Sequence, residues 1–190
     1  MRDKIISYMQ EHLNDHRMRH CLGVEQEARK IAKRFGLDED KAALAGLMHD
    51  CAKWMSDDEY IQRSKDYGIV MDDILLDNPT LLHGSASAHV MKHDFGITDQ
   101  EVMDAVCYHC VPRTDMKPLD MLVGVADLTE TNRSFEGVEA IREASRRNLR
   151  EAYIASRANV MKHVAERKAL VHPSMIYAYN KAIMDLKSEG

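Results

Sequence analysis

The chain has 190 residues, of which 45% are hydrophobic and 30% charged, and it carries 9 Gly and 4 Pro. This length suits one domain, and the composition excludes a disordered, collagen-like or linker-like chain. The net charge of −5, from 26 basic and 31 acidic residues, disfavours general nucleic-acid binding because no overall positive field attracts a polyanion. Ten His accompany four Cys, which excludes a disulfide scaffold and favours a His/carboxylate site.

The segment Met1–Ser7 lacks the apolar stretch of a signal peptide, and no run of about 18 apolar residues is present that could cross a membrane. The sparse Cys fit reduced thiols. We therefore expect a cytoplasmic protein that binds neither a membrane nor nucleic acid. The sequence leaves the oligomeric state open, with a homodimer as one alternative.

Apolar residues recur at helical spacing along most of the chain, and capping residues or glycines mark many ends. The predicted helices cover residues 17–35, 38–51, 56–67, 85–95, 98–109, 118–127, 137–147, 148–169 and a stretch after Pro173. A turn is expected at Asp77–Thr80. No segment alternates as a half-buried strand does, so the sequence predicts an all-α fold with no linker or internal repeat.

Several side chains of metal-ligand type follow the apolar stripes of these helices. They are His20, the adjacent pair His49 and Asp50, His109 and Asp127. Burial of an imidazole or a carboxylate is costly unless the group is paired or bound to a metal. A shared cation in the helical core is the simplest explanation for all five.

The His49-Asp50 pair is followed by Lys53, so two ligand types and one cation lie within a single turn. Adjacent residues point about 100° apart on a helix, but near a helix end both can reach one ion. A His-Asp dipeptide alone is weak support, because such pairs arise by chance.

The order of these residues is more specific than any one of them. Their order along the chain resembles the H…HD…H…H…D pattern of the HD-domain metal-dependent phosphohydrolases. The matching residues are His20, His49-Asp50, His83, His109 and Asp127. The short motifs around these residues are similar to those of the YqeK family. They are Arg17–His20, Leu44–Lys53, Leu81–Gly84, Tyr108-His109, Ala126-Asp127, Asn132-Arg133 and Leu170–Asn180. These are the symmetrically cleaving bis(5′-nucleosyl)-tetraphosphatases of bacteria, and the resemblance covers about Asp15 to Asn180.

The resemblance implies a fold and a site. It implies that residues 1–190 form a single HD domain, a helical bundle with a metal site in its core. Residues 15–130 would form the core of the domain, and C-terminal helices in residues 137–187 would pack on it. The implied metal ligands are His20, His49, Asp50 and Asp127. The implied catalytic residues are Asp50, Lys53, His83 and His109. The implied nucleotide contacts are His20, Asp50, Lys53, His83, His109, Arg133, His172 and Tyr177.

One departure from the family concerns the loop after His109. The family usually continues its Tyr-His with Thr-Thr-Gly, whereas Cys110-Val111-Pro112 follow here. This change leaves the implied metal ligands intact and puts the loop's substrate contacts in question.

The residue types suit a hydrolytic metal centre. A His/carboxylate set without thiolate favours iron, with manganese or another mid-row ion as alternatives, over structural zinc. One divalent or trivalent ion is expected, and His83 and His109 are left with two roles, protonation of the departing nucleotide or binding of a second ion. Lys53 and Arg133 would face the phosphates of a dinucleoside polyphosphate or an ADP-like nucleotide.

The resulting hypothesis is cleavage of diadenosine tetraphosphate into two ADP. The alternatives are an HD phosphohydrolase for a nucleoside monophosphate, a cyclic nucleotide or a guanosine polyphosphate, and a non-catalytic nucleotide sensor. An RNA-binding adaptor would use the basic run from Arg142 to Lys168, but interleaved Glu residues favour a solvated, salt-bridged helix face. The C-x-x-C at Cys107–Cys110 and the pair His89/His93 are interpreted as ordinary core and surface residues.

Overall fold

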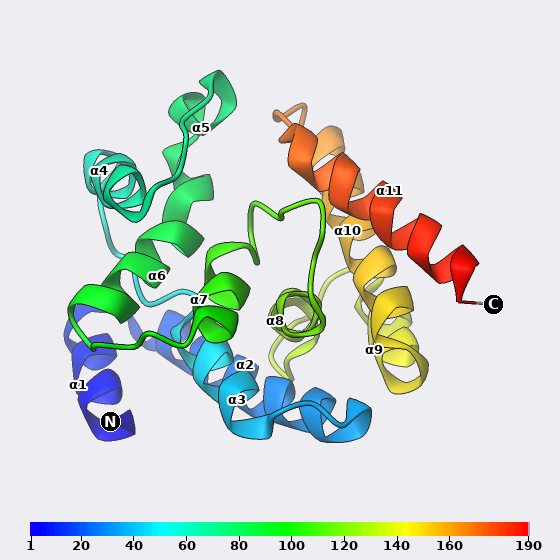
Figure 1. Ribbon diagram of the computed structural model, residues 1–190, viewed down its shortest axis with the longest axis horizontal. Coiled ribbons are helices and arrows are strands. Elements are labelled where there is room, and N and C mark those ends of the chain that lie inside the picture. Colours follow the sequence, from blue (N-terminus) through cyan, green and yellow to red (C-terminus); the bar gives the residue numbers. More distant parts are fainter. Residues whose placement is uncertain (190) are drawn as a thin grey trace.

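A computed structural model describes residues 1–189 and shows a helical protein (Figure 1). The described residues form eleven α-helices and one 3₁₀ helix, with no strand, which confirms the all-α prediction. The helices are α1 Arg2–His12, α2 Asp15–Phe35, α3 Glu39–Met48, α4 Asp57–Tyr67, α5 Asp73–Asp77, η1 Pro79–Leu82, α6 His83–His93, α7 Gln100–Cys107, α8 Pro118–Thr129, α9 Val138–Arg147, α10 Leu149–Glu166 and α11 Pro173–Ser188. Within residues 1–189, no helix is long and apolar enough to cross a membrane.

Local capping explains many of these boundaries. The Asp38 side chain accepts from the backbone N–H groups of the first turn of α3, and Ser56 begins α4 with a capping box closed by Glu59. Gly36 ends α2 at a φ of 67°, a left-handed conformation that glycine adopts without a steric penalty. The predictions for these three ends are confirmed.

Other boundaries were predicted wrongly. Helices α1 and α5 were not predicted, and the expected turn at Asp77–Thr80 is split between the end of α5 and the start of η1. Helices α3, α7 and α10 end at Met48, Cys107 and Glu166, two or three residues before the ends predicted from their apolar patterns. The patterns continue because the turns that follow α3 and α7 are also buried, so hydrophobicity alone does not mark where these helices stop.

Helix α8 lies near the centre of the molecule, with α4–α6 on one side and α9–α11 on the other (Figure 1). Helices α2 and α3 pack closely, and a Cβ added at Gly46 would approach the Val24 carbonyl oxygen to 2.9 Å. Gly84 has the same function between α6 and α7, where a Cβ would meet the Cys107 carbonyl oxygen at 2.7 Å. These glycines let four buried helices surround one point. The division into a core of 15–130 and added C-terminal helices stays a prediction.

The basic run in α9 and α10 is only partly the solvated face that we expected. Arg146 and Arg147 pair with Glu143 as predicted. Arg157, however, is 3% exposed and donates to the carbonyl oxygens of His109 and Gly124. Arg142 similarly donates to the carbonyls of Thr129, Glu130 and Arg133, in addition to its pair with Glu139. The solvated interpretation is therefore wrong for Arg157 and Arg142, which connect the C-terminal helices to the loops around the centre.

Candidate metal centre

Six side chains converge where the central helices meet, and they are called the His/Asp cluster below. Helix α2 supplies His20, the turn after α3 supplies His49 and Asp50, α6 begins with His83, the turn after α7 supplies His109, and α8 supplies Asp127. All are buried except Asp127, whose side chain is 21% exposed. The structure therefore brings together every expected metal ligand and both additional histidines.

One half of the cluster is built around His20. Its Nε2 lies 3.0 Å from Asp127 Oδ1 and 3.2 Å from His49 Nε2. His49 Nε2 is 3.6 Å from Asp50 Oδ2 and 3.8 Å from Asp127 Oδ1. His20, His49 and Asp50 form a group able to hold a metal ion, and Asp127 lies beside this group without belonging to it.

The other half uses the second oxygen of Asp50. His83 Nε2 lies 3.2 Å from Asp50 Oδ1 and 3.0 Å from His109 Nε2, and His109 Nε2 is 3.9 Å from the same oxygen. Asp50, His83 and His109 form a second group of potential ligands. Asp50 therefore belongs to both groups.

The backbone sets the tautomer of three of these rings. In each, Nδ1 lies near the carbonyl oxygen of the residue three positions earlier: His49 to Gly46 at 2.7 Å, His83 to Thr80 at 2.6 Å and His109 to Val106 at 2.7 Å. A carbonyl only accepts, so Nδ1 carries the proton and donates it. Each Nε2 is then an unprotonated ligand atom, which is how metal-binding histidines are commonly oriented.

His20 differs from these three rings because a carboxylate lies near each of its nitrogens, and its Nε2 is 3.0 Å from Asp127 Oδ1. Its Nδ1 lies 3.1 Å from Glu130 Oε1, and Glu130 is only 1% exposed. The Nε2 atoms of His20 and His49 lie 3.2 Å apart, and those of His83 and His109 lie 3.0 Å apart. Two unprotonated Nε2 atoms, as in His83 and His109, cannot hydrogen-bond to each other, whereas ligands about 2.1 Å from one ion lie about 3 Å apart. The donor set fits a cation.

The ionisation states agree with this. Burial and neighbouring positive charge lower the pKa of His49 and hold that of His83 well below its ordinary value. Burial lowers the pKa of His109 to about 4. Burial disfavours ionised Asp50, but His49, Lys53, His83 and His109 outweigh it and hold the Asp50 pKa below its usual range. At neutral pH, His49, His83 and His109 are thus neutral and Asp50 is ionised, the forms that bind metals.

A hollow of about 140 Å³ opens onto the cluster and is called the mouth hollow. Lys53 lies in its wall, with Nζ 3.8 Å from Asp50 Oδ1 and 3.0 Å from His83 Nδ1. Arg133 lies in the same wall, donates to Asp127 Oδ1 at 2.5 Å, and is part-exposed. With Arg17 and Arg157, four cationic side chains thus line the mouth hollow, which suits a polyphosphate.

His172 and Tyr177 lie outside the cluster. His172 caps α11, with Nε2 2.8 Å from Asp72 Oδ2, and it borders a separate hollow with Tyr108. Tyr177 is 59% exposed on α11. Met175 of the same segment lines the mouth hollow, so the beginning of α11 is near the opening even though these two side chains do not enter it.

Sequence reasoning missed two charged residues at the cluster. Arg17 donates to Asp50 Oδ2 at 2.6 Å, and Glu130 binds His20 as described. Arg17 is three residues before His20 on the same helix face, a spacing that could have identified it. Glu130 has no such signal, because it lies in the turn after α8 and is 110 residues from its partner.

Among the described residues, those interpreted as incidental belong to neither group of potential metal ligands. The four cysteines are free, with Cys107 buried and Cys110 part-buried at the mouth hollow. His89 and His93 stack on each other at 4.2 Å on α6.

Comparison with known proteins bears on this geometry. The family model described as HD domain matches residues 17–132, which span from α2 to just after α8 and contain the whole cluster. The chain belongs to the HD-domain family. Within this HD family it groups with YqeK-type proteins.

Two HD relatives cover nearly all of the chain. One from Halalkalibacterium halodurans is 32% identical over 98% of this chain and 99% of its own length. One from Bacillus subtilis is 34% identical over 94% of this chain and 96% of its own. Both are named symmetrical bis(5'-nucleosyl)-tetraphosphatase.

A solved structure shares the fold closely. A chain from Clostridium acetobutylicum, described as a predicted HD superfamily hydrolase involved in NAD metabolism, superposes with a TM-score of 0.93 at 34% identity. The match covers 97% of this chain and 98% of that one. The HD fold is therefore shared from end to end, including the C-terminal helices.

Proposed function

We propose that this protein hydrolyses diadenosine tetraphosphate symmetrically, so that one molecule of substrate and one of water give two ADP. The convergence of four histidine Nε2 atoms on the carboxylates of Asp50 and Asp127 carries the proposal, because this donor set fits a cation and Asp50 and Asp127 border the mouth hollow. The choice of substrate is supported by the relatives that match nearly the full length of the chain and are named for this activity.

The proposed ion is held by His20, His49, Asp50 and Asp127, with His83 and His109 as ligands for a second one. Iron is the proposed ion, with manganese or another mid-row ion as alternatives, and imidazole and carboxylate ligands without thiolate suit all of these metals. When bound, such an ion supplies Lewis acidity that activates water and neutralises charge on the phosphoryl oxygens. Arg17 supports this by holding Asp50 Oδ2 ionised and oriented.

The residues around the opening would bind and orient the polyphosphate. Arg133 offers a planar fork and Lys53 a point charge, and both line the mouth hollow. Water attacks one of the two central phosphorus atoms, the bond to the central bridging oxygen breaks, and that oxygen leaves on the second ADP. Positive charge at Lys53 and Arg133 stabilises the negative charge that grows on these oxygens.

Between the two roles left open for His83 and His109, the environment favours ligation. The pKa of His109 is lowered to about 4 and that of His83 lies well below its ordinary value, both chiefly through burial. Neutral rings whose Nδ1 protons are used by carbonyls have no proton to give from Nε2. Their unprotonated Nε2 atoms instead point at Asp50.

The test is product analysis on a substrate panel. We expect the purified protein to convert diadenosine tetraphosphate into ADP alone, and a chelator to stop the reaction. ATP plus AMP as products, or faster hydrolysis of a nucleoside monophosphate, a cyclic nucleotide or a guanosine polyphosphate, would contradict the proposal. Bound nucleotide without turnover would indicate a sensor. A cytoplasmic location and a homodimer stay predictions.

A further inference from the structure

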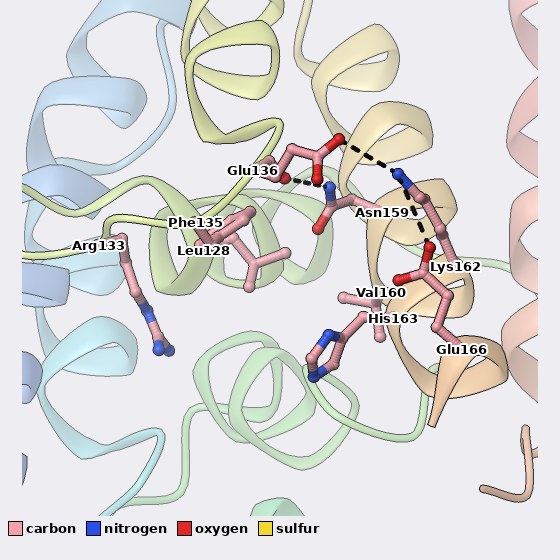
Figure 2. A pocket seen from close by; sticks show the side chains of 9 residues that line it. All are labelled: Leu128, Arg133, Phe135, Glu136, Asn159, Val160, Lys162, His163 and Glu166. Carbon is pink, nitrogen blue, oxygen red and sulfur yellow. Dashed lines mark hydrogen bonds and ion pairs between the residues drawn. The ribbon is translucent and has the colours of Figure 1, made fainter. Parts of the chain in front are cut away.

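A second hollow, called the side hollow, lies beside the mouth hollow and has a volume of about 330 Å³ (Figure 2). Leu128, Arg133 and Val160 line both hollows, so the two adjoin. In Figure 2 the Arg133 side chain stands on one side of the side hollow, and Val160 and His163 stand on the other, with Leu128 between them. A molecule whose phosphates lie at Arg133 can therefore extend into this space.

The side hollow has the character of a nucleoside site. Helix α8, the loop after it and helix α10 supply three part-buried apolar side chains, Leu128, Phe135 and Val160. His163 and Asn159 add hydrogen-bonding groups at the edge. An aromatic face with a few polar groups is how proteins commonly hold a base, because the ring stacks and its edge finds donors and acceptors.

The charged side chains around the side hollow also favour a nucleoside at this position. At the end of the side hollow away from Arg133, Lys162 lies 3.4 Å from Glu136 and 3.9 Å from Glu166, so two carboxylates share one ammonium group (Figure 2). This excess of negative charge repels phosphate and tolerates a neutral group. A ligand with its phosphates at Arg133 and its uncharged nucleoside at His163 matches both ends.

We propose that the side hollow binds the second nucleoside of a dinucleoside polyphosphate. The inference rests on the proposed function, because a substrate cut at its centre has a nucleoside on each side of the reacting phosphates. The segment at the start of α11 borders the mouth hollow through Met175 and serves one nucleoside; the side hollow serves the other.

A competing space lies across Arg133. It is a hollow of about 410 Å³ lined by His16, Arg19 and Asn132 among others. Phe135 is its only apolar residue, and it shares Arg133 alone with the mouth hollow. Its polar wall suits solvent better than a base, and it provides a control.

The experiment compares two substrates that share four phosphates and differ by one nucleoside, diadenosine tetraphosphate and adenosine 5′-tetraphosphate. The variants are Phe135→Ala and His163→Ala, with His16→Ala as the matched control, since His16 and His163 are both exposed histidines near Arg133. For each, kcat/KM is measured on both substrates, and thermal unfolding checks the fold.

We expect the ratio of kcat/KM on the dinucleotide to that on the mononucleotide to fall about tenfold in Phe135→Ala, mainly through KM, because one stacked base is lost. A smaller fall is expected in His163→Ala, and His16→Ala keeps the wild-type ratio. Because Phe135 borders both hollows, the comparison of His163→Ala with His16→Ala decides between them: an unchanged ratio in His163→Ala, or a fall in His16→Ala, would overturn the inference.

A second readout separates this inference from the proposed function. Calorimetric titration of the metal-loaded protein with ADP should give two binding sites per chain in the wild type and weaken one of them in Phe135→Ala. If the wild type cleaves neither substrate, the proposed function fails while the titration still decides the inference. A single ADP site unaffected by Phe135→Ala would contradict it.

Discussion

His20 and His49 face each other with 3.2 Å between their Nε2 atoms, while Nδ1 of His20 lies 3.1 Å from Glu130 and Nδ1 of His49 donates to the Gly46 carbonyl. A cation bound between the two rings would be held by both nitrogen atoms and only in the folded protein. We therefore expect metal binding and stability to be coupled here.

Removal of one of the two rings tests this coupling. We expect His20→Ala to lower bound metal at least tenfold and to lose most of the rise in unfolding temperature that metal gives the wild type. His93→Ala, an exposed histidine on α6, is the control and should match the wild type. Elemental analysis after dialysis and thermal unfolding with and without chelator provide the two measurements. Full metal content in His20→Ala would contradict the assignment.

Glu130 should orient His20 without touching the ion. It is 1% exposed, and its second carboxylate oxygen accepts from the Asn132 backbone N–H at 2.7 Å. In Glu130→Gln one oxygen is replaced by an NH₂ group, so either His20 or Asn132 loses its acceptor. Loss of such an outer contact typically costs about 10–100-fold in metal affinity. A competitive chelator titration measures this, and an unchanged affinity would show that Glu130 has no such role.

Gly84 should keep α6 and α7 close enough for His83 to reach His109. A Cβ there would meet the carbonyl oxygens of Cys107 and Val106 at 2.7 and 2.9 Å, and backbone cannot yield as a side chain does. We expect Gly84→Ala to cost about 1–3 kcal/mol in the free energy of unfolding and to lower turnover. Gly124→Ala is the control, since its Cβ would meet Arg157 at an ordinary 3.5 Å. Denaturant unfolding of both variants decides, and equal stabilities would refute the close-packing argument.

The buried histidines should make the metal-free protein sensitive to acid. The folded pKa of His109 is about 4, below the 6.5 of the free side chain, so its contribution to stability is present above pH 6.5 and lost as pH falls towards 4. One such group is worth on the order of 3 kcal/mol over this window. Urea unfolding of chelated protein from pH 7 to pH 4 should show the decline, and His109→Gln should reduce its slope. A variant slope equal to that of the wild type would exclude His109 as a cause.

The sequence predicted the cluster better than it predicted the surroundings. The helical stripes place His20 and Asp127 on buried faces, and the order of ligand types supplies the rest. His109, however, lies in the turn after α7 and not on the predicted helix, and its Nδ1 bonds back to the Val106 carbonyl. No local pattern indicates such a bond.

Long-range partners were also beyond local reasoning. Arg157 belongs to a basic run that resembles a solvated face, yet it is buried against the His109 carbonyl 48 residues away. Glu130 is similarly identified only when α2 and the end of α8 are placed side by side. Periodicity shows which face is buried, and tertiary packing decides which charged residues on it find partners.

The central claim, that the His/Asp cluster holds the ion that cleaves diadenosine tetraphosphate, is tested most directly at Asp50, which contacts both halves of the cluster. Metal content and turnover are measured together in Asp50→Ala, with Asp50→Asn as a near-isosteric second variant and circular dichroism to verify folding. We predict that folded variants lose both bound metal and ADP formation. A folded variant that is metal-free yet fully active would contradict the claim.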